Sequence, residues 1–302
     1  MLVSASENGW LRERAPRYRF IRSAAARFLP GEDVESAMAA ARLLARDGIA
    51  TLVTYLGENV RDRSESQGVT QQYLDLLENI HAEALPAEIS VKLTQLGLDV
   101  DPELCYTNLA KLVERAGPQT VWIDMEQSAY VDRTLELYER VQKAHRQTGI
   151  CLQAYLYRTG KDLASLVSMG ASVRLVKGAY NEPREIAYAS KSEVDESYFH
   201  LAQVLLGAEA RRLGVRAVMA THDRELITRI TEWAAQEGLT KTQLEFAMLY
   251  GIQRSEQLRL AREGYRSDVL ISYGTFWFPW YMRRLAERPA NAFFVVRQLF
   301  SG

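Results

Sequence analysis

The segment Ser172-Val-Arg-Leu-Val-Lys-Gly-Ala-Tyr180 decides how the fold of this chain is interpreted. The apolar and β-branched residues in its first half predict a buried strand. The same segment carries Arg174 and Lys177, and burying two cations is costly unless an anionic group meets them. Ordinary structural ion pairs would explain these cations equally well. Whether they belong to a binding site or to a structural network therefore depends on which residues the other strands carry at their ends.

Strand and helix patterns alternate eight times along the chain. The β-rich apolar runs occur at 50–55, 89–94, 121–126, 150–156, 172–176, 216–221, 244–250 and 268–273. Segments with apolar residues at helical spacing separate them. This alternation predicts a parallel sheet, and eight such units predict a closed (βα)8 TIM barrel of the α/β class. An open, doubly wound sheet is the weaker alternative, because no Gly-x-Gly-x-x-Gly turn follows any of the runs.

No linker or low-complexity segment interrupts this alternation. Residues 1–30 indicate one or two short helices outside the repeat, and Asp33 is a candidate N-cap for a helix that ends near Arg46. We therefore expect a single domain, with an N-terminal helical extension over 1–48 and the catalytic barrel over 49–302. The polar connection at 181–194 is expected to be either a lid that moves or an ordinary solvated loop.

The composition of the chain excludes several classes of protein. Its 302 residues are 47% hydrophobic and 25% charged, with a formal net charge of −1, which is typical of a globular protein with ample core. The near-neutral charge gives no reason to expect nucleic acid as a partner. Cys105 and Cys151 lack paired spacing, so no disulfide framework is indicated. The chain shows neither a spanning apolar segment nor a signal peptide, so we expect a cytoplasmic protein and leave peripheral membrane contact open.

Polar side chains recur near the predicted ends of the strands. In a barrel of this type, the carboxyl-terminal ends of the strands build the active site. The residues that we assign to these ends are Glu58, Lys92, Asp124, Glu126, Gln153, Tyr155, Arg174, Lys177, His222, Asp223 and Glu245. Each alone could be part of a structural pair, but so many polar groups in an interior that is normally apolar predict a functional site.

Most of the candidate site is cationic, which suits a phosphate-bearing cofactor or a carboxylate substrate. The cations are Lys92, Arg174, Lys177, Arg283 and Arg284. His222 has no partner at metal-binding spacing, so we expect no metal. The aromatic stretch at 276–281 predicts a helix that packs across the barrel mouth and brings Arg283 and Arg284 to the site. A solvated charged face, or an aromatic patch for a partner or a membrane, is the alternative for this helix.

Taken together, these motifs resemble the proline dehydrogenase family in its short, single-function bacterial form. The motifs are Leu56-Gly-Glu58, Val91-Lys92-Leu93, Gln153-Ala-Tyr155, the segment from Arg174 to Tyr180, Ala220-Thr-His222, Tyr250-Gly251, and Arg283-Arg284 with Glu287 and Asn291. The resemblance implies a distorted (βα)8 barrel that holds FAD non-covalently under its last helix. It also implies oxidation of L-proline to Δ1-pyrroline-5-carboxylate by hydride transfer to flavin N5, with a quinone as the electron acceptor.

The resemblance also assigns roles by position. The catalytic residues would be Arg174, Lys92 and Asp124. The substrate-binding residues would be Lys92, Arg283, Arg284, Glu58, Tyr180, Leu270 and Trp280. The cofactor-binding residues would be Gln153, Arg174, Lys177, Gly178, Ala179, Thr221, His222, Glu287 and Asn291. The resemblance implies no metal, and it leaves the oligomeric state undecided.

Three positions depart from the family pattern. Leu270 and Trp280 stand where the family usually has tyrosines that wall the substrate ring, and Ser272 stands where a proline is common. The same flavin chemistry on another cyclic or N-alkyl amino acid is therefore an alternative to L-proline. A flavin-binding barrel without turnover is a second alternative. A Schiff-base aldolase that uses Lys92 or Lys177 is a third, although it would leave the arginine pair and Gln153 unexplained.

Overall fold

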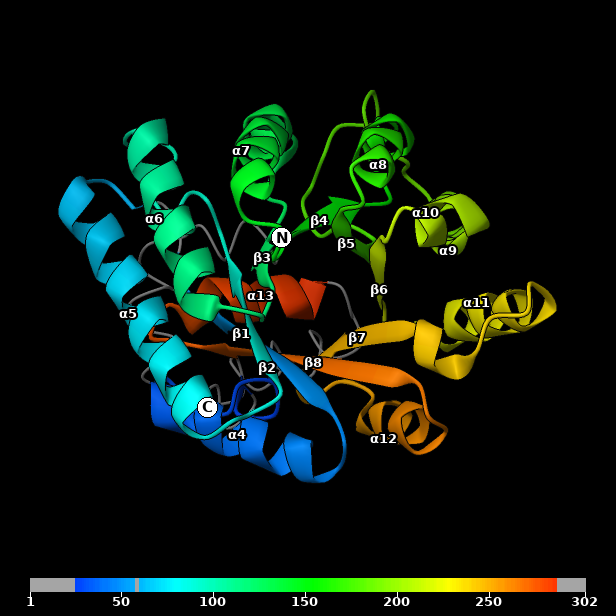
Figure 1. Ribbon diagram of the computed structural model, residues 1–302, viewed down its shortest axis with the longest axis horizontal. Helices are drawn as coiled ribbons and strands as arrows, with labels where there is room; N and C mark the ends of the chain where they lie inside the picture. Colours follow the sequence, from blue (N-terminus) through cyan, green and yellow to red (C-terminus); the bar gives the residue numbers. More distant parts are fainter. Residues whose placement is uncertain (1–24, 58–59, 287–302) are drawn as a thin grey trace, which may run out of the picture.

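The structure is a computed structural model that describes residues 25–57 and 60–286, without the side chains of residues 279 and 283–286. Eight parallel strands form a closed barrel in chain order, and β8 pairs with β1 to close it (Figure 1). The strands are β1 Ala50–Tyr55, β2 Ala87–Val91, β3 Val121–Ile123, β4 Thr148–Gln153, β5 Ser172–Val176, β6 Arg216–Ala220, β7 Glu245–Leu249 and β8 Arg266–Tyr273. The predicted TIM barrel is confirmed.

Helices surround the barrel, as Figure 1 shows. They are α4 Val34–Arg46, α5 Arg63–Ala82, α6 Pro102–Ala116, α7 Val131–Ala144, α8 Thr159–Ser168, α9 Lys191–Leu206, α10 Ala208–Arg212, α11 Arg224–Gln236, α12 Arg254–Arg262 and α13 Trp277–Ala286, with short 3-10 turns η2 Ser128–Tyr130 and η3 Lys241–Gln243. Asp33 caps α4 as predicted, because its carboxylate accepts a hydrogen bond of 2.7 Å from the Ser36 amide. None of the described helices is long and apolar enough to cross a membrane.

The strands differ from their predicted ranges mainly at their ends. β3 and β4 each stop three residues early, because the chain after Ile123 and Gln153 leaves the ladder to form loops. Glu126 shows the reason: its carboxylate accepts hydrogen bonds from the backbone amide and the hydroxyl of Thr94, at 3.2 and 2.7 Å. Apolar runs therefore locate the strands, whereas polar contacts between loops decide where each strand ends.

The middle of the barrel is filled by a small apolar cluster. Leu52, Trp122, Val218 and Ala247 form it, and Leu270 packs against them. Because successive strand residues alternate between the two faces, these positions point inward while their neighbours pack against the helices. The apolar layer separates two groups of polar side chains, one at each end of the barrel.

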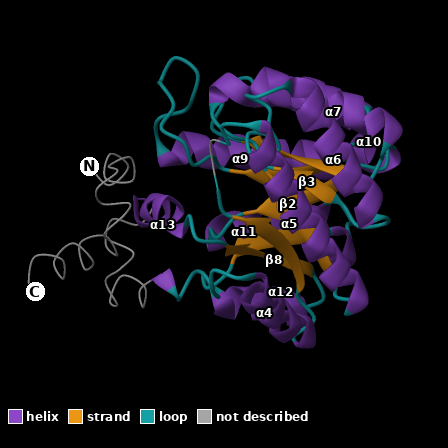
Figure 2. Cartoon of the chain, turned by 90° about the vertical axis from the view of Figure 1, so that its left-hand side faces the viewer, coloured by secondary structure: helices purple, strands orange, loops and turns teal. Residues whose placement is uncertain are grey.

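The last described helix, α13, closes the mouth of the barrel, as predicted. Figure 2 shows it to the side of the strand ends. Trp280 contributes to the wall of the central cavity. Trp277 donates a hydrogen bond of 2.9 Å to Glu32, and the Tyr281 ring lies 6.2 Å from the Phe28 ring. The segment before α4 therefore holds the helix in place over the mouth.

The connection at 181–194 is bound to its neighbours at several points. The Glu182 carboxylate accepts hydrogen bonds from the amide and hydroxyl of Ser128, at 2.7 and 2.5 Å. Leu156 and Ala187 form an isolated antiparallel bridge, and the Tyr157 hydroxyl donates to a backbone carbonyl of the connection at 2.9 Å. These contacts favour the ordinary-loop interpretation over a lid.

Candidate active site

A cavity of about 920 Å³ opens at the carboxyl-terminal ends of the strands. Every residue to which the family resemblance assigns a role, and whose side chain is described, lies on its wall, whereas Glu126, Tyr155 and Glu245 of the predicted strand ends do not. The residues with an assigned role on the wall are Lys92, Asp124, Gln153, Arg174, Lys177, Gly178, Ala179, Tyr180, Thr221, His222, Leu270 and Trp280. Glu58, Glu287 and Asn291 lie outside the described residues, as do the side chains of Arg283 and Arg284 on α13. The barrel thus brings together residues that are far apart in the sequence.

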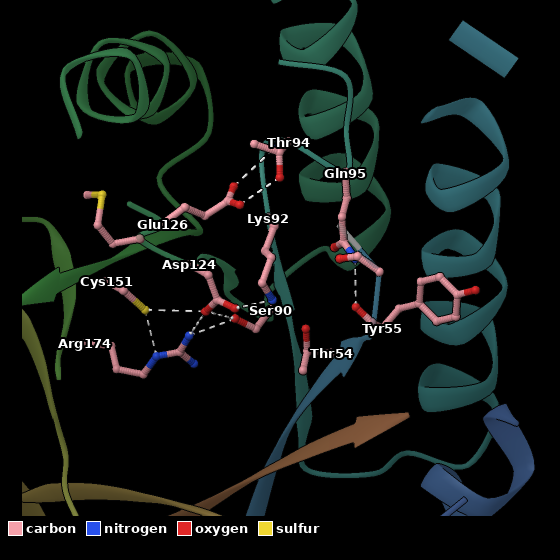
Figure 3. A network of polar contacts seen from close by, with 12 residues as sticks. Thr54, Tyr55, Ser90, Lys92, Thr94, Gln95, Asp124, Glu126, Cys151 and Arg174 are labelled. Atoms are coloured by element: carbon pink, nitrogen blue, oxygen red, sulfur yellow. Dashed lines mark hydrogen bonds and ion pairs between the residues drawn. The ribbon is translucent and has the colours of Figure 1, made fainter. Parts of the chain in front are cut away.

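Several neighbours on the cavity wall bind the Arg174 guanidinium (Figure 3). Arg174 is the central residue of β5 and is only 3% exposed. Its Nη2 donates to the Asp124 carboxylate and, at 2.8 Å, to the Ser90 hydroxyl. Its Nε donates to the Cys151 sulfur at 2.9 Å. The remaining nitrogen, Nη1, is buried and has no hydrogen-bond partner among the described residues.

Asp124 lies between two cations. Its Oδ2 is 3.4 Å from the Lys92 ammonium, and its Oδ1 accepts from Arg174 and, at 2.7 Å, from Ser90. Burial would raise the pKa of Asp124, but Lys92 and Arg174 hold that pKa below its ordinary value. One carboxylate therefore fixes two positive groups side by side on the cavity wall.

A tryptophan forms the floor beneath Arg174. Trp122 is fully buried, and the guanidinium carbon of Arg174 lies 5.3 Å from its ring centre. A side chain at Gly149 would clash with this ring, since a Cβ there would lie 2.5 Å from it. Glycine on β4 thus makes room for the indole, and the indole supports the guanidinium by a cation–π contact.

Gln153 presents an acceptor to the cavity. Its Nε2 donates to the backbone carbonyls of Met125 and Glu126, at 3.3 and 3.2 Å, which fixes the side chain. Its Oε1 is buried and finds no hydrogen-bond partner in the described part of the chain. Buried polar atoms are normally satisfied, so this oxygen and Arg174 Nη1 together indicate a missing ligand.

The turn after β5 requires glycine. Gly178 has a φ of +117°, and a Cβ there would lie 2.3 Å from the ring of Tyr155. This left-handed backbone passes directly over Tyr155 and lines the cavity. The predicted close approach of backbone and ligand at this step is therefore sterically feasible.

Two lysines and two aspartates alternate at the rim. Lys177 and Lys191 each contact both Asp195 and Asp223, at 2.9 Å in the case of Asp223. Burial would raise the pKa of Asp223, but the hydrogen bonds from Lys177 and Lys191 hold it far below the ordinary value. This part of the rim is thus neutral overall, so the site is less cationic than its sequence indicated. A Schiff-base role for Lys177 also loses support, because a doubly paired ammonium is a poor nucleophile.

His222 connects two strand ends. Its Nε2 accepts a hydrogen bond of 2.8 Å from the backbone amide of Leu249. An amide can only donate, so Nε2 must be unprotonated, and the imidazole is fixed in orientation against the end of β7.

The prediction for Glu245 was wrong. It is the first residue of β7, so it lies at the amino-terminal end of the barrel, away from the cavity. There Arg216 binds both Glu245 and Glu88, at 2.5 and 2.7 Å, and Trp122 donates to Glu88 at 2.7 Å. Glu245 therefore belongs to a structural network, because parallel strands bring their first residues together at the end opposite the site.

Sequence reasoning missed several residues around Arg174 and Lys177. Ser90 and Cys151 stand two positions before Lys92 and Gln153 on the same strands, so strict alternation would have placed them on the same inward face. Lys191 and Asp195 give no comparable signal, because they lie on α9 and reach the rim only through the fold.

Comparison with known proteins agrees with this geometry. The family model described as proline dehydrogenase matches residues 37–297. The chain is 36% identical to proline dehydrogenase 1 of Bacillus subtilis (strain 168) over 294 residues, which cover 97% of this chain and 95% of the relative. It is 37% identical to the proline dehydrogenase of Deinococcus radiodurans over 285 residues, covering 92% of this chain and 90% of the relative.

Solved structures show the same fold. Proline utilization A from Bdellovibrio bacteriovorus, inactivated by N-propargylglycine, superposes with a TM-score of 0.79 at 25% identity, over 88% of this chain and 32% of that one. Proline utilization A from Corynebacterium freiburgense gives 0.76 at 22% identity, over 96% of this chain and 34% of that one. The chain spans about a third of these larger proteins. With the family model and close relatives matched over nearly its whole length, the chain belongs to the proline dehydrogenase family.

Proposed function

We propose that this protein oxidises L-proline to Δ1-pyrroline-5-carboxylate with bound FAD and passes the electrons to a quinone. Membership of the family implies proline dehydrogenase activity and a flavin. The resemblance in the motifs further implies that the flavin is FAD and that a quinone accepts the electrons. The observation that carries the proposal is that the residues of one cavity wall include unsatisfied buried polar atoms, among them Arg174 Nη1 and Gln153 Oε1, with Ser272 Oγ as a third.

These residues fit a flavin. The edge of an isoalloxazine ring presents both acceptors and an N–H donor, and the cavity offers a fixed donor at Arg174 and a fixed acceptor at Gln153. The backbone at Gly178 and Ala179, together with Lys177, Thr221 and His222, would hold the rest of the cofactor. When bound, the flavin supplies the hydride acceptor for the reaction.

The chain itself orients the substrate. Lys92 stands beside Asp124 on the cavity wall, and we propose that its ammonium binds the substrate carboxylate together with Arg283 and Arg284. Fixing the carboxylate fixes the orientation of the ring, and with it the Cδ–H bond whose hydride is lost when the C=N bond of Δ1-pyrroline-5-carboxylate forms between nitrogen and Cδ. The Arg174 guanidinium adds a fixed positive charge where negative charge arrives with the hydride.

Leu270 and Trp280 both line this cavity, which supports the proposal that they contact the substrate ring. A leucine in place of a tyrosine gives up a hydroxyl and aromatic area at this wall. L-proline is the proposed substrate, and other cyclic or N-alkyl amino acids are the comparators that define how far the pocket accepts variation.

The test is an anaerobic visible spectrum of the purified protein, recorded before and after L-proline. We expect a flavin spectrum that bleaches with L-proline. Parallel titrations with pipecolate, 4-hydroxyproline and sarcosine measure the tolerance of the ring pocket. A flavin spectrum that bleaches only with a comparator would overturn L-proline as substrate, and a colourless protein after incubation with FAD would overturn the proposal as a whole.

A further inference from the structure

We propose that Cys151 is a positioning residue that sets the orientation of the Arg174 guanidinium on the cavity wall, and with it the direction of its unbonded nitrogen Nη1. This inference rests on the proposed function, because it assigns that nitrogen to the flavin. Cys151 and Arg174 are direct partners in the β4–β5 register, and the Cys151 sulfur accepts the Arg174 Nε hydrogen at 2.9 Å.

The contacts restrict rotation of the Arg174 guanidinium both within its plane and out of that plane. Cys151 and Asp124 bind the edge formed by Nε and Nη2, so the group cannot turn within its plane. Trp122 lies 5.3 Å from the guanidinium carbon and supports the face of the plane. A planar, delocalised guanidinium held in this way has one direction left for Nη1, which is the buried position without a partner among the described residues.

The thiol can accept and donate at the same time. Burial raises the pKa of the Cys151 thiol to about 12, so the sulfur keeps its hydrogen. It accepts from Arg174 Nε and lies 3.7 Å from Asp124 Oδ1, to which the S–H can donate. Cys151 therefore joins the cation to its carboxylate without adding a charge of its own.

A purely space-filling cysteine would have different consequences, and the chain contains a matched control. Cys105 is also fully buried and unpaired, and its sulfur lies 3.5 Å from the backbone carbonyl of Leu93, but it is not on the cavity wall. Valine has nearly the shape of cysteine and cannot hydrogen-bond, whereas serine keeps the acceptor and the donor.

The experiment compares Cys151→Val, Cys151→Ser and Cys105→Val with the wild-type flavoprotein. We expect Cys151→Val to slow flavin reduction by L-proline about tenfold, as for a lost hydrogen bond to a charged group. We expect a midpoint potential about 30 mV more negative, which corresponds to a tenfold weaker preference for the reduced two-electron state. Cys151→Ser should recover most of both quantities, and Cys105→Val should leave both unchanged.

Crystal structures of the Cys151 variants measure the guanidinium direction independently of any flavin. We expect Arg174 to rotate in Cys151→Val and to keep its direction in Cys151→Ser. An unmoved guanidinium in Cys151→Val, or a rate and potential equal to those of Cys105→Val, would overturn the inference. Failure of the proposed function would instead appear in the wild-type protein, as absence of flavin or of reduction by L-proline.

Discussion

The two ends of the barrel carry similar side chains but have different roles. At the amino-terminal end, Arg216 binds Glu88 and Glu245, and Asp268 lies against Glu245. At the carboxyl-terminal end, Arg174 and Lys92 share Asp124. Both ends hold an arginine beside carboxylates, buried in the case of Arg174 and half-buried in the case of Arg216, so the number of charged residues does not distinguish a site from a structural network.

Hydrogen-bond satisfaction distinguishes them. At the carboxyl-terminal end, Arg174 Nη1 and Gln153 Oε1 are buried atoms of two cavity-lining residues, and neither has a hydrogen-bond partner in the described structure. At the other end, Asp268 Oδ2 lacks a donor while it is ionised, but burial, followed by the charge of Glu245, raises the pKa of Asp268 well above its ordinary value. A proton on Asp268 can then be donated to Glu245, and this network closes on itself.

The largest expected effect is a loss of stability when the network around Arg216 at the amino-terminal end is disrupted. Arg216→Met should lower the free energy of unfolding by about 3–5 kcal/mol, because it leaves the buried Glu245 and the half-buried Glu88 without the arginine that binds both. Denaturant unfolding measures this change. Arg266→Met is the matched control, since Arg266 is 57% exposed at 3.5 Å from Glu245 and should contribute less than about 1 kcal/mol. Equal losses in both variants would contradict the comparison.

A somewhat smaller effect is expected from the corresponding change at the other end. Arg174→Lys keeps the positive charge but cannot reach Cys151, Asp124 and the cavity together. We expect flavin reduction by L-proline to slow about 100-fold to 1000-fold, or about 2.7–4 kcal/mol on the barrier. Stopped-flow spectroscopy measures it. Unchanged reduction would show that the free nitrogen of Arg174 serves the fold alone.

The smallest effect concerns protons in the amino-terminal network. The raised pKa of Asp268 means that the folded state keeps a proton which the unfolded chain releases above about pH 4, so this contribution to stability is lost as pH rises. Asp268→Asn should therefore raise the free energy of unfolding at pH 8 by on the order of 1 kcal/mol. It should have little effect at pH 4. Thermal unfolding across this range measures the difference, and a variant less stable than wild type at pH 8 would contradict the assignment.

The sequence predicts most of the fold because the strands are short apolar runs in regular alternation with helices. It also predicts much of the cavity wall, since Gln153, Arg174 and Lys177, which stand at predicted strand ends, all line the cavity. The sequence prediction placed Glu245 at the wrong end of its strand, because a polar residue in an apolar run does not indicate at which end of the strand it lies. Cys151 escaped notice because its importance comes from Arg174, a partner on the next strand.

The contact between the segment before α4 and the last helix has a consequence for how the protein is made. Glu32 and Trp277 are 245 positions apart, yet they meet at the mouth of the barrel, beside the β1–β8 seam. When the first seven strands have been synthesised, the eighth strand and Trp280, which contributes to the wall of the cavity, are therefore still missing. The cavity therefore has its complete wall only after the segment that follows β7, through Trp280, has been synthesised.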